Sequence, residues 1–440
     1  MKKLSWRNAN PFEQKTLLLF LVAFCIRIII IVSSYFIIGW PIGSSTENRI
    51  DLALNILNGN GFALNGFPVL YQTPVHPMFY AVVFLFAGYN WLSIGLSQAL
   101  IDSFTCVIIA KLGNTFNSDK GIIAGYIYAF YPFANTQTAA IVDTSLLTFL
   151  FILSVYLLLN FRKTNRYIFL VLGGLFLGLG ILDRPSIGFV VPAFIVLLFI
   201  SRQYLKSFLI HSSLFIFLVS IIPLSWCVRN YILSGEFPVL SVAGNHYLWY
   251  SHNKHVLTIW ERKESPDLVG KDPRYQMDPN FQVRDFYGIP AKQQVKLGKQ
   301  ASNIALNYIK NNPGDFIRYT LLKLERFLSW EYVVQNKLGR EKYLWLRIWV
   351  QRFTSAPVVI LGWLGLLLLF SRDKKIGIFV SIIVVGFIIT FVLTQFVSRH
   401  KFPLDALFIS LSPVSILFLK QKFLLVKYRI FKKDDDRKQT

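Results

Sequence analysis

Cysteine is scarce in this sequence of 440 residues. The three cysteines, Cys25, Cys106 and Cys227, lack the spacing of a zinc site or a redox pair, so we expect inert packing residues. A glycine-rich phosphate loop is also absent, and the glycines between 173 and 180 lie in an apolar run, where they favour helix packing. The sequence therefore excludes a P-loop nucleotide site and gives no sign of a cysteine-based centre.

Acidic side chains are few as well, 23 against 46 Lys and Arg, which gives a net charge of +23. In a soluble protein this excess would indicate nucleic-acid binding. Here 54% of the residues are hydrophobic, mean hydropathy is +0.48, and several apolar runs approach the length of a bilayer crossing. The basic residues lie between these runs, so they orient a membrane chain and no nucleic-acid partner is expected.

The runs predict an all-α polytopic membrane protein. Lys15 to Trp40 is too long for a signal peptide's apolar stretch, so we expect it to remain as the first helix. Placing the basic clusters inside gives about ten transmembrane helices and two cytoplasmic termini. The helices are expected near residues 15–38, 91–112, 120–138, 144–161, 167–182, 186–201, 207–226, 355–371, 376–396 and 404–419. Val75 to Gly88 rises only about 21 Å as a helix, so we interpret it as re-entrant or interfacial.

Four regions follow from this topology. Residues 1–228 form a seven-helix module with a first outer loop at 41–74, and residues 229–354 form a small mixed extracytoplasmic domain. Residues 355–420 hold the C-terminal transmembrane helices, and residues 421–440 form a disordered cytoplasmic tail. Pro313 to Tyr332 has the spacing of an amphipathic helix, which is typical of a helix on the membrane surface or of one packed onto its own domain.

Acidic residues on the outer face mark where chemistry is expected. Glu47 opens a short amphipathic helix that stops at Gly59 and Gly61, and Asp51 lies one turn further on. The apolar face expected to meet the membrane consists of Ile50, Ala53, Leu54 and Leu57. Asp143 opens a later helix after an outer turn. Stabilisation of a helix start is the alternative role for Glu47 and Asp143, and ordinary solvation is the alternative for Asp51.

These landmarks resemble the polyprenol-dependent C superfamily of membrane glycosyltransferases, which includes protein O-mannosyltransferase-like and lipid A aminoarabinose transferase-like enzymes. Glu47 to Phe62 resembles the family's acidic residue, amphipathic helix and glycine–phenylalanine turn. Thr73 to Pro77 departs from the family's proline-proline-x-tyrosine-proline element, because one proline and the tyrosine are replaced. The further landmarks are, in order, Asp143, Leu182 to Pro185, Arg229 to Tyr231, Gly244 to His246 and Ser398 to Pro403.

The resemblance implies that a sugar moves, with inversion, from a polyprenyl-phosphate or polyprenyl-diphosphate donor to a lipid, glycan or protein acceptor. It places this reaction on the extracytoplasmic face of a bacterial inner (plasma) membrane. A carboxylate must take the acceptor's proton, and Glu47, Asp143 and Asp51 are the candidates. Cations must neutralise the departing phosphate. The candidates for binding the lipid phosphate or substrate are Arg184, Arg229, Arg399, Lys401, His76 and His246.

Simpler roles stay open for several of these residues. Arg229, Arg399 and Lys401 also suit anchoring of helix ends to headgroups, and Arg184 also suits an ion pair with Asp183. His246 belongs to a histidine-rich stretch that lacks a partner carboxylate or cysteine pattern, so we predict no metal site there. A sugar-facing loop or ordinary domain folding is favoured instead. No cofactor is indicated with certainty, and a divalent cation remains open.

Two charges lie inside predicted membrane helices. Arg27 is midway along the first and Asp102 is midway along the span at 91–112, at matching depths. An isolated charge at that depth costs about 2.5 to 3.5 kcal/mol, so we predict a structural ion pair between them. The competing functions are a lipid-linked-sugar transporter or flippase, which needs charges at several depths, and an O-antigen polymerase or ligase. Charges that gather at one face, and the acidic first loop, favour transfer.

Overall fold

The computed structural model describes residues 11–38, 47–116, 120–140, 142–201, 204–237, 240–257, 286–329, 344–394 and 398–438. Within these residues the structure is almost entirely helical, and the sheet is one hairpin of β1 (Ala63–Leu64) and β2 (Phe67–Pro68). Seven described helices are long and apolar enough to cross a membrane. They are α1 (Pro11–Ile38), α4 (Trp91–Phe116), α7 (Thr144–Thr164), α10 (Leu205–Ser234), α15 (Leu344–Arg372), α16 (Lys374–Leu393) and α17 (Phe402–Lys438). The all-α polytopic fold class is confirmed.

Three of the ten predicted crossings are shorter or interrupted. The segment 120–138 is not one helix but α5 (Gly121–Ala129) and α6 (Pro132–Ala139). Pro132 has no N–H and disfavours a helical residue before it, and Tyr131 is accordingly extended, with φ −70° and ψ 112°. The other two are α8 (Tyr167–Asp183) and the pair η2 (Pro185–Phe189) and α9 (Val190–Ser201). The prediction from hydropathy missed the break at Pro132, whereas the other two segments have bounds close to the predicted 167–182 and 186–201.

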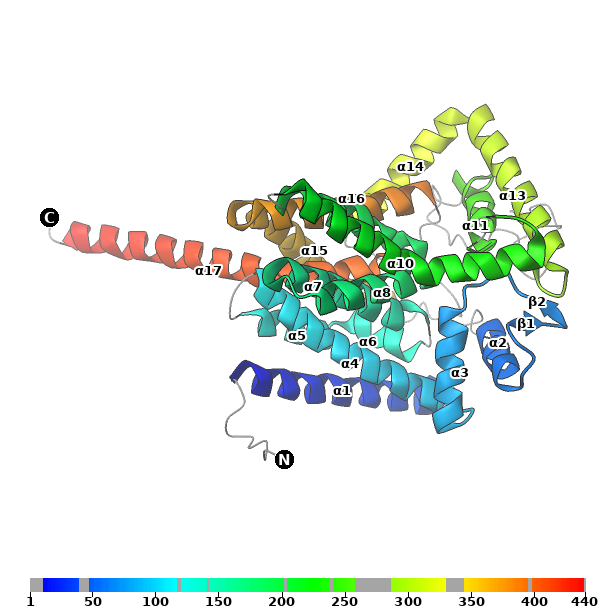
Figure 1. The fold of residues 1–440 in the computed structure, drawn as a ribbon. Coiled ribbons are helices and arrows are strands. Elements are labelled where there is room, and N and C mark those ends of the chain that lie inside the picture. The colour runs from blue at the N-terminus through cyan, green and yellow to red at the C-terminus, as the bar shows by residue number, and fades with distance from the viewer. Residues whose placement is uncertain are drawn as a thin grey trace.

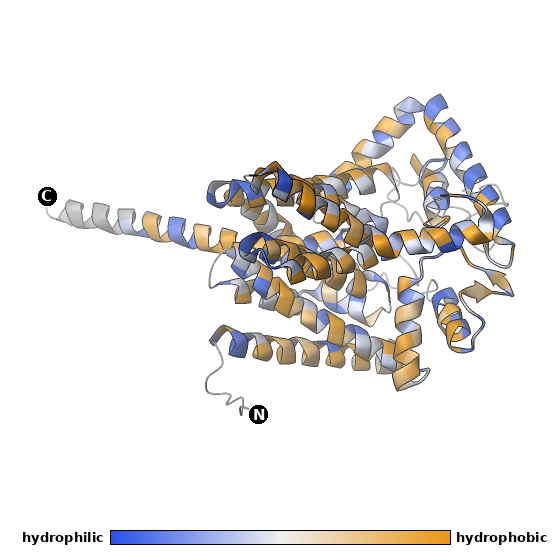
Figure 2. Cartoon of the chain, in the orientation of Figure 1, coloured by the Kyte–Doolittle hydropathy of each residue, from blue (hydrophilic) through white to orange (hydrophobic). Residues whose placement is uncertain are grey.

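The helices differ in how deeply they lie in the bundle. In α7 and α17, 78% of the most apolar window is buried, against 28% in α1 and α10. α17 packs against α15, α4, α5 and α7, which makes it central (Figure 1). The middle of the bundle is mostly hydrophobic, and hydrophilic residues gather toward its two ends (Figure 2). This pattern is typical of a protein whose middle part is surrounded by lipid.

The elements that carry the acidic loop gather at the end of the bundle opposite the two termini (Figure 1). They include α2 (Glu47–Leu57), the hairpin and α3 (Val75–Ala87). α2 stops where predicted, at Gly59 and Gly61, which both have positive φ. Its apolar face does not meet the membrane as expected. Ile50 and Ala53 are buried against α3, because a helix too short to cross the bilayer offers its own apolar face to α2.

The described part of the outer domain is helical rather than mixed. It consists of α11 (Ala243–Ser251), α13 (Ala291–Asn311) and α14 (Pro313–Leu328). α14 buries Tyr319 and Phe327, and the Phe327 ring stacks on Phe391 of α16 at 5.7 Å between centroids. The predicted amphipathic helix thus packs this face onto protein. α17 continues through Lys438, so the backbone of the tail is helical there instead of disordered, since no proline or glycine follows Pro413.

Candidate functional site

Asp143 lies between two arginines at the outer end of the bundle. Its Oδ2 is 3.1 Å from Nη2 of Arg49 and 2.5 Å from Nη2 of Arg184. The three side chains are 10%, 20% and 15% exposed, respectively, so the contacts are largely withdrawn from solvent. One carboxylate and two guanidinium groups leave a net charge of +1, which suits an anionic ligand.

Helix ends bring these three residues together. Arg49 is in the first turn of α2, Asp143 directly precedes α7, and Arg184 follows α8. α8 stops at Arg184 because Pro185 disfavours a helical residue before it, and Arg184 adopts φ −149° and ψ 113°. The extended backbone lets its side chain leave the helix axis. Nη1 of Arg184 is buried without a hydrogen-bond partner in the described part of the chain.

His76 and Asp183 form a second pair beside this group. Nδ1 of His76 is 2.6 Å from Oδ1 of Asp183, and both side chains are 3% exposed. Thr73 donates a hydrogen bond from Oγ1 to the Asp183 carbonyl at 3.2 Å. The alternative in which Arg184 pairs with its neighbour Asp183 is therefore wrong: Asp183 binds His76, and Arg184 reaches Asp143. Nε2 of His76 has no hydrogen-bond partner among the described atoms.

The other acidic candidates are placed differently. Glu47 is the first residue of α2, and its side chain lies outside the described residues. Arg49 follows two positions later, so its ion pair brings the first turn of α2 to Asp143. Asp51 is exposed on the same helix. The backbone geometry thus puts the start of α2 at the site.

Arg229 holds the first outer loop. Its Nη1 donates to the Val69 carbonyl at 2.9 Å and its Nη2 to the Phe62 carbonyl at 3.2 Å. The guanidinium carbon lies 4.5 Å from the centroid of the Trp226 ring. The Arg229 guanidinium therefore donates to the backbone of the first outer loop. The sequence had predicted a contact with the lipid phosphate or anchoring of a helix end to headgroups, and not these bonds.

Two further candidates are buried in contacts within the protein, and one is not described. Lys401 donates from Nζ to the Ser329 carbonyl at 2.9 Å, and burial lowers the pKa of its ammonium group to about 8. Nδ1 of His246 is 2.9 Å from the Tyr71 hydroxyl. The side chain of Arg399 lies outside the described residues. These described contacts tie Lys401 to the end of α14 and His246 to the first outer loop.

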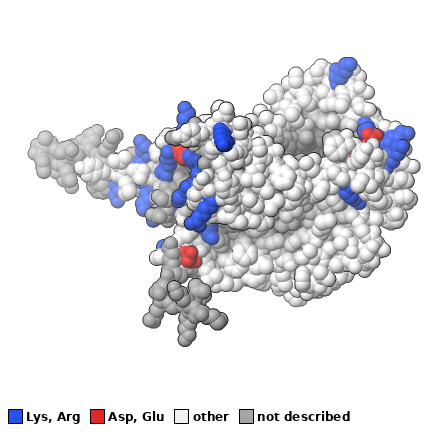
Figure 3. All heavy atoms as spheres, in the orientation of Figure 1, with Lys and Arg blue, Asp and Glu red and all other residues white. Residues whose placement is uncertain are grey.

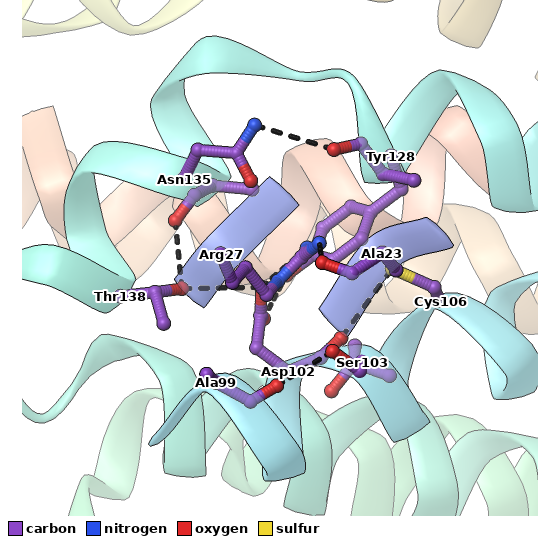
Figure 4. Close-up of polar contacts among 12 residues, drawn as sticks. Ala23, Arg27, Ala99, Asp102, Ser103, Cys106, Tyr128, Asn135 and Thr138 are labelled. Atoms are coloured by element: carbon purple, nitrogen blue, oxygen red, sulfur yellow. Dashed lines mark hydrogen bonds and ion pairs between the residues drawn. The ribbon is translucent and has the colours of Figure 1, made fainter. Parts of the chain in front are cut away.

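Arg27 and Asp102 meet inside the bundle, and both are fully buried (Figure 4). Nε and Nη2 of Arg27 each lie 2.6 Å from Oδ2 of Asp102. Tyr128 donates to the other oxygen at 2.7 Å, and Thr138 donates to Oδ2 at 3.2 Å. These bonds satisfy a carboxylate that apolar helices surround. The arrangement is structural because it ties α1, α4, α5 and α6 together.

Sequence reasoning gave no role to Arg49 and gave Asp183 only an ion pair with Arg184. The partner of Arg49 is 94 positions away and the partner of Asp183 is 107 positions away, so no local spacing links them. Asp183 lies within the landmark Leu182 to Pro185, which is a weak signal. Within the described residues no group of three His, Cys, Asp or Glu side chains is arranged to hold a metal ion.

Most of the residues that build the site lie in a segment that is similar to a known protein family. Residues 71–226 match the family model of dolichyl-phosphate-mannose-protein mannosyltransferase. The suspected resemblance is confirmed there. The matched segment includes His76, Asp143, Asp183 and Arg184, and it ends before the outer domain. This match supports the resemblance to the C superfamily of glycosyltransferases.

Among solved structures, a similar one is the crystal structure of ArnT from Cupriavidus metallidurans bound to undecaprenyl phosphate. The two chains share 13% sequence identity, and the TM-score is 0.43. The alignment covers 90% of this chain and 77% of ArnT. No curated protein matches the chain.

Proposed function

We propose that this protein transfers a sugar from a polyprenyl-phosphate-linked donor to a lipid, glycan or protein acceptor at the extracytoplasmic surface of a membrane. The observation that carries the proposal is the group of Arg49, Asp143 and Arg184 at one end of a membrane bundle. Its net positive charge and the unpaired Nη1 of Arg184 suit a phosphate oxygen. The family match to residues 71–226 supports a lipid-linked sugar donor.

The position of this group also fits a lipid phosphate. A polyprenyl tail stays in the bilayer, so its phosphate lies where helices end, and Asp143 and Arg184 both flank such ends. Arg49 and Arg184 neutralise the phosphate as it departs, and Asp143 holds both guanidinium groups in place. Arginine suits this role because its planar fork makes two parallel bonds to a phosphate.

Proton removal from the acceptor hydroxyl is assigned to Glu47. The Arg49–Asp143 ion pair draws the first turn of α2 to the site, and Glu47 begins that turn. Asp143 is less suited to the task, because two guanidinium groups compete with a proton for its oxygens. His76, oriented by Asp183 and with a free Nε2, lines the same region and suits a hydroxyl of the sugar or acceptor.

The test is sugar transfer from a radiolabelled polyprenyl-phosphate sugar in membranes, at matched protein levels. Glu47→Gln is expected to lower transfer at least about 100-fold, since a general base alone contributes about 10² to 10⁴. Asp143→Asn is also expected to lower transfer, because Arg49 and Arg184 lose the carboxylate that holds them in place. Glu325→Gln, at an exposed acidic residue of α14, is the matched control and keeps full transfer. Wild-type protein that transfers nothing from several donors contradicts the proposal. Full transfer by Glu47→Gln removes Glu47 as the base.

A further inference from the structure

The extended segment from Phe62 to Tyr71 is held from outside its own loop. It connects α2 to α3, and its hairpin lies beside α13 of the outer domain (Figure 1). Beyond the bonds from Arg229, the Val242 N–H donates to the Leu70 carbonyl at 3.0 Å. Ser241 donates from Oγ to the Tyr71 carbonyl at 2.6 Å. Residues far along the chain therefore satisfy the backbone of this segment.

Gln294 of α13 makes the most complete of these contacts. Its side chain is fully buried, and its Oε1 accepts from the Leu70 N–H at 2.9 Å. Its Nε2 donates to the Pro68 carbonyl at 2.7 Å and to the Ile289 carbonyl at 3.0 Å. One neutral amide thus serves one donor and two acceptors. A carboxylate of the same size lacks the two N–H groups and places a negative charge against two carbonyl oxygens.

The segment that Gln294 grips leads directly into the proposed site. Thr73, three residues after Leu70, donates to the Asp183 carbonyl, and His76 binds the Asp183 side chain. Ser241 holds the Tyr71 carbonyl, and Pro74 fixes φ between Thr73 and His76, so rotation between Leu70 and His76 is limited. The path from α13 to the His76–Asp183 pair is short and stiff.

We propose that Gln294 is a positioning residue for sugar transfer: by fixing Pro68 and Leu70 it sets where Thr73 and His76 meet Asp183. The outer-domain helix α13 thereby completes the site instead of merely covering it. This inference rests on the proposed function for its kinetic consequence. A misplacement of about 1 Å costs about 100-fold in rate, so the effect falls on turnover.

Two variants test it against a matched control one residue away. Gln294→Glu replaces the N–H donor group with an acceptor oxygen. Gln294→Met removes all three hydrogen bonds while the side chain keeps a similar length. Gln293→Glu and Gln293→Met make the same changes at an exposed position of α13. Transfer is measured per folded protein. The Gln294 variants are expected to lower kcat at least about 10-fold while KM for the lipid-linked donor changes less than about 2-fold, because Arg49 and Arg184 are untouched. The Gln293 variants keep both values.

A second readout does not need activity. Thr73 is half-buried, and Thr73→Cys introduces a thiol there for labelling by a water-soluble maleimide. The labelling rate is expected to rise at least about 10-fold when Thr73→Cys is combined with Gln294→Met. It is not expected to rise with Gln293→Met. Unchanged kcat and unchanged labelling overturn the inference while leaving the proposed function intact. Absence of wild-type transfer overturns the proposed function, and labelling alone then decides the role of Gln294. Failure of both Gln294 variants to fold makes it a folding residue and also overturns the inference.

Discussion

The Arg27–Asp102 pair shows how a charge is kept inside an apolar bundle. Asp102 accepts from Arg27, Tyr128 and Thr138, so its oxygens are engaged from three other helices (Figure 4). A buried ion pair gains little over an apolar pair, yet removal of one partner leaves the other charge uncompensated. The stability of the bundle should therefore depend on the match between the two residues more than on either charge.

Asp102→Asn tests that match. The change leaves the Arg27 guanidinium buried without a counter-charge, so we expect a loss of about 3–5 kcal/mol in the free energy of unfolding. Arg27→Met combined with Asp102→Asn removes both charges and should recover much of the loss. Thermal unfolding in detergent measures both proteins. A double variant no more stable than Asp102→Asn contradicts direct pairing as the source of the effect.

Arg184→Lys tests the proposed phosphate contact. Lysine keeps the charge but has no planar fork, so it cannot reach both Asp143 and a phosphate oxygen in the same way. We expect KM for the lipid-linked donor to rise about 10-fold, equivalent to about 1.4 kcal/mol, with a smaller change in kcat. Arg318→Lys, at an exposed position on α14, is the control. An equal fall in kcat with unchanged KM would assign Arg184 to the transition state alone.

At the scale of elements, sequence patterns predicted what depends on local spacing. The start and stop of α2 follow from Glu47 and the glycines at 59 and 61, and the depth of Arg27 and Asp102 follows from helix rise. The sequence patterns did not predict which element each face of a helix packs against. Ile50 packs on α3, and Arg49 reaches Asp143, because tertiary contacts across 94 positions leave no periodic signal. The break at Pro132 was readable from proline chemistry, but the apolar run concealed it.

The docking of α14 on α16 should depend on pH. Lys323 is fully buried, donates to the Thr394 carbonyl at 2.9 Å, and faces Tyr319 and His252. Burial lowers its pKa to about 7, and that of Lys401 to about 8. Between these values and the ordinary pKa near 10.5, the unfolded chain binds more protons than the folded one, so stability rises with pH across this window.

Lys323→Met is expected to weaken that rise. The wild-type melting temperature should increase from pH 7 to pH 10, while the variant, which keeps the Lys401 contribution, should show a smaller increase. Lys310→Met, at an exposed lysine of α13, should behave like wild type. The measurement is thermal unfolding at several pH values in one detergent. Identical slopes for wild type and Lys323→Met would mean that Lys323 is not the titrating group.

At the scale of the whole molecule, charge is distributed along the bundle axis. Lys and Arg are densest at the end from which both termini emerge, further Lys and Arg lie at the opposite end, and the visible middle carries almost no charge (Figure 3). Arg162 lies in the last turn of α7 and Arg372 ends α15, at basic positions that the sequence assigned to the cytoplasm. The loops that build the site lie at the opposite end (Figure 1). Under the positive-inside rule, this polarity supports the proposal that the site lies on the extracytoplasmic side.

Membrane-impermeant labelling tests this orientation directly. Lys299 on α13 and Lys375 at the start of α16 are both exposed. The proposed topology puts them on opposite sides of the membrane. Lys299→Cys should react with an impermeant maleimide in intact cells, whereas Lys375→Cys should react only after permeabilisation. The parent protein serves as the blank, because Cys106 and Cys227 are buried and Cys25 lies within α1. The reverse pattern would place the Asp143 group in the cytoplasm, where an extracytoplasmic transfer reaction is impossible. Labelling of both sites in intact cells would contradict the ten-span topology without deciding the chemistry.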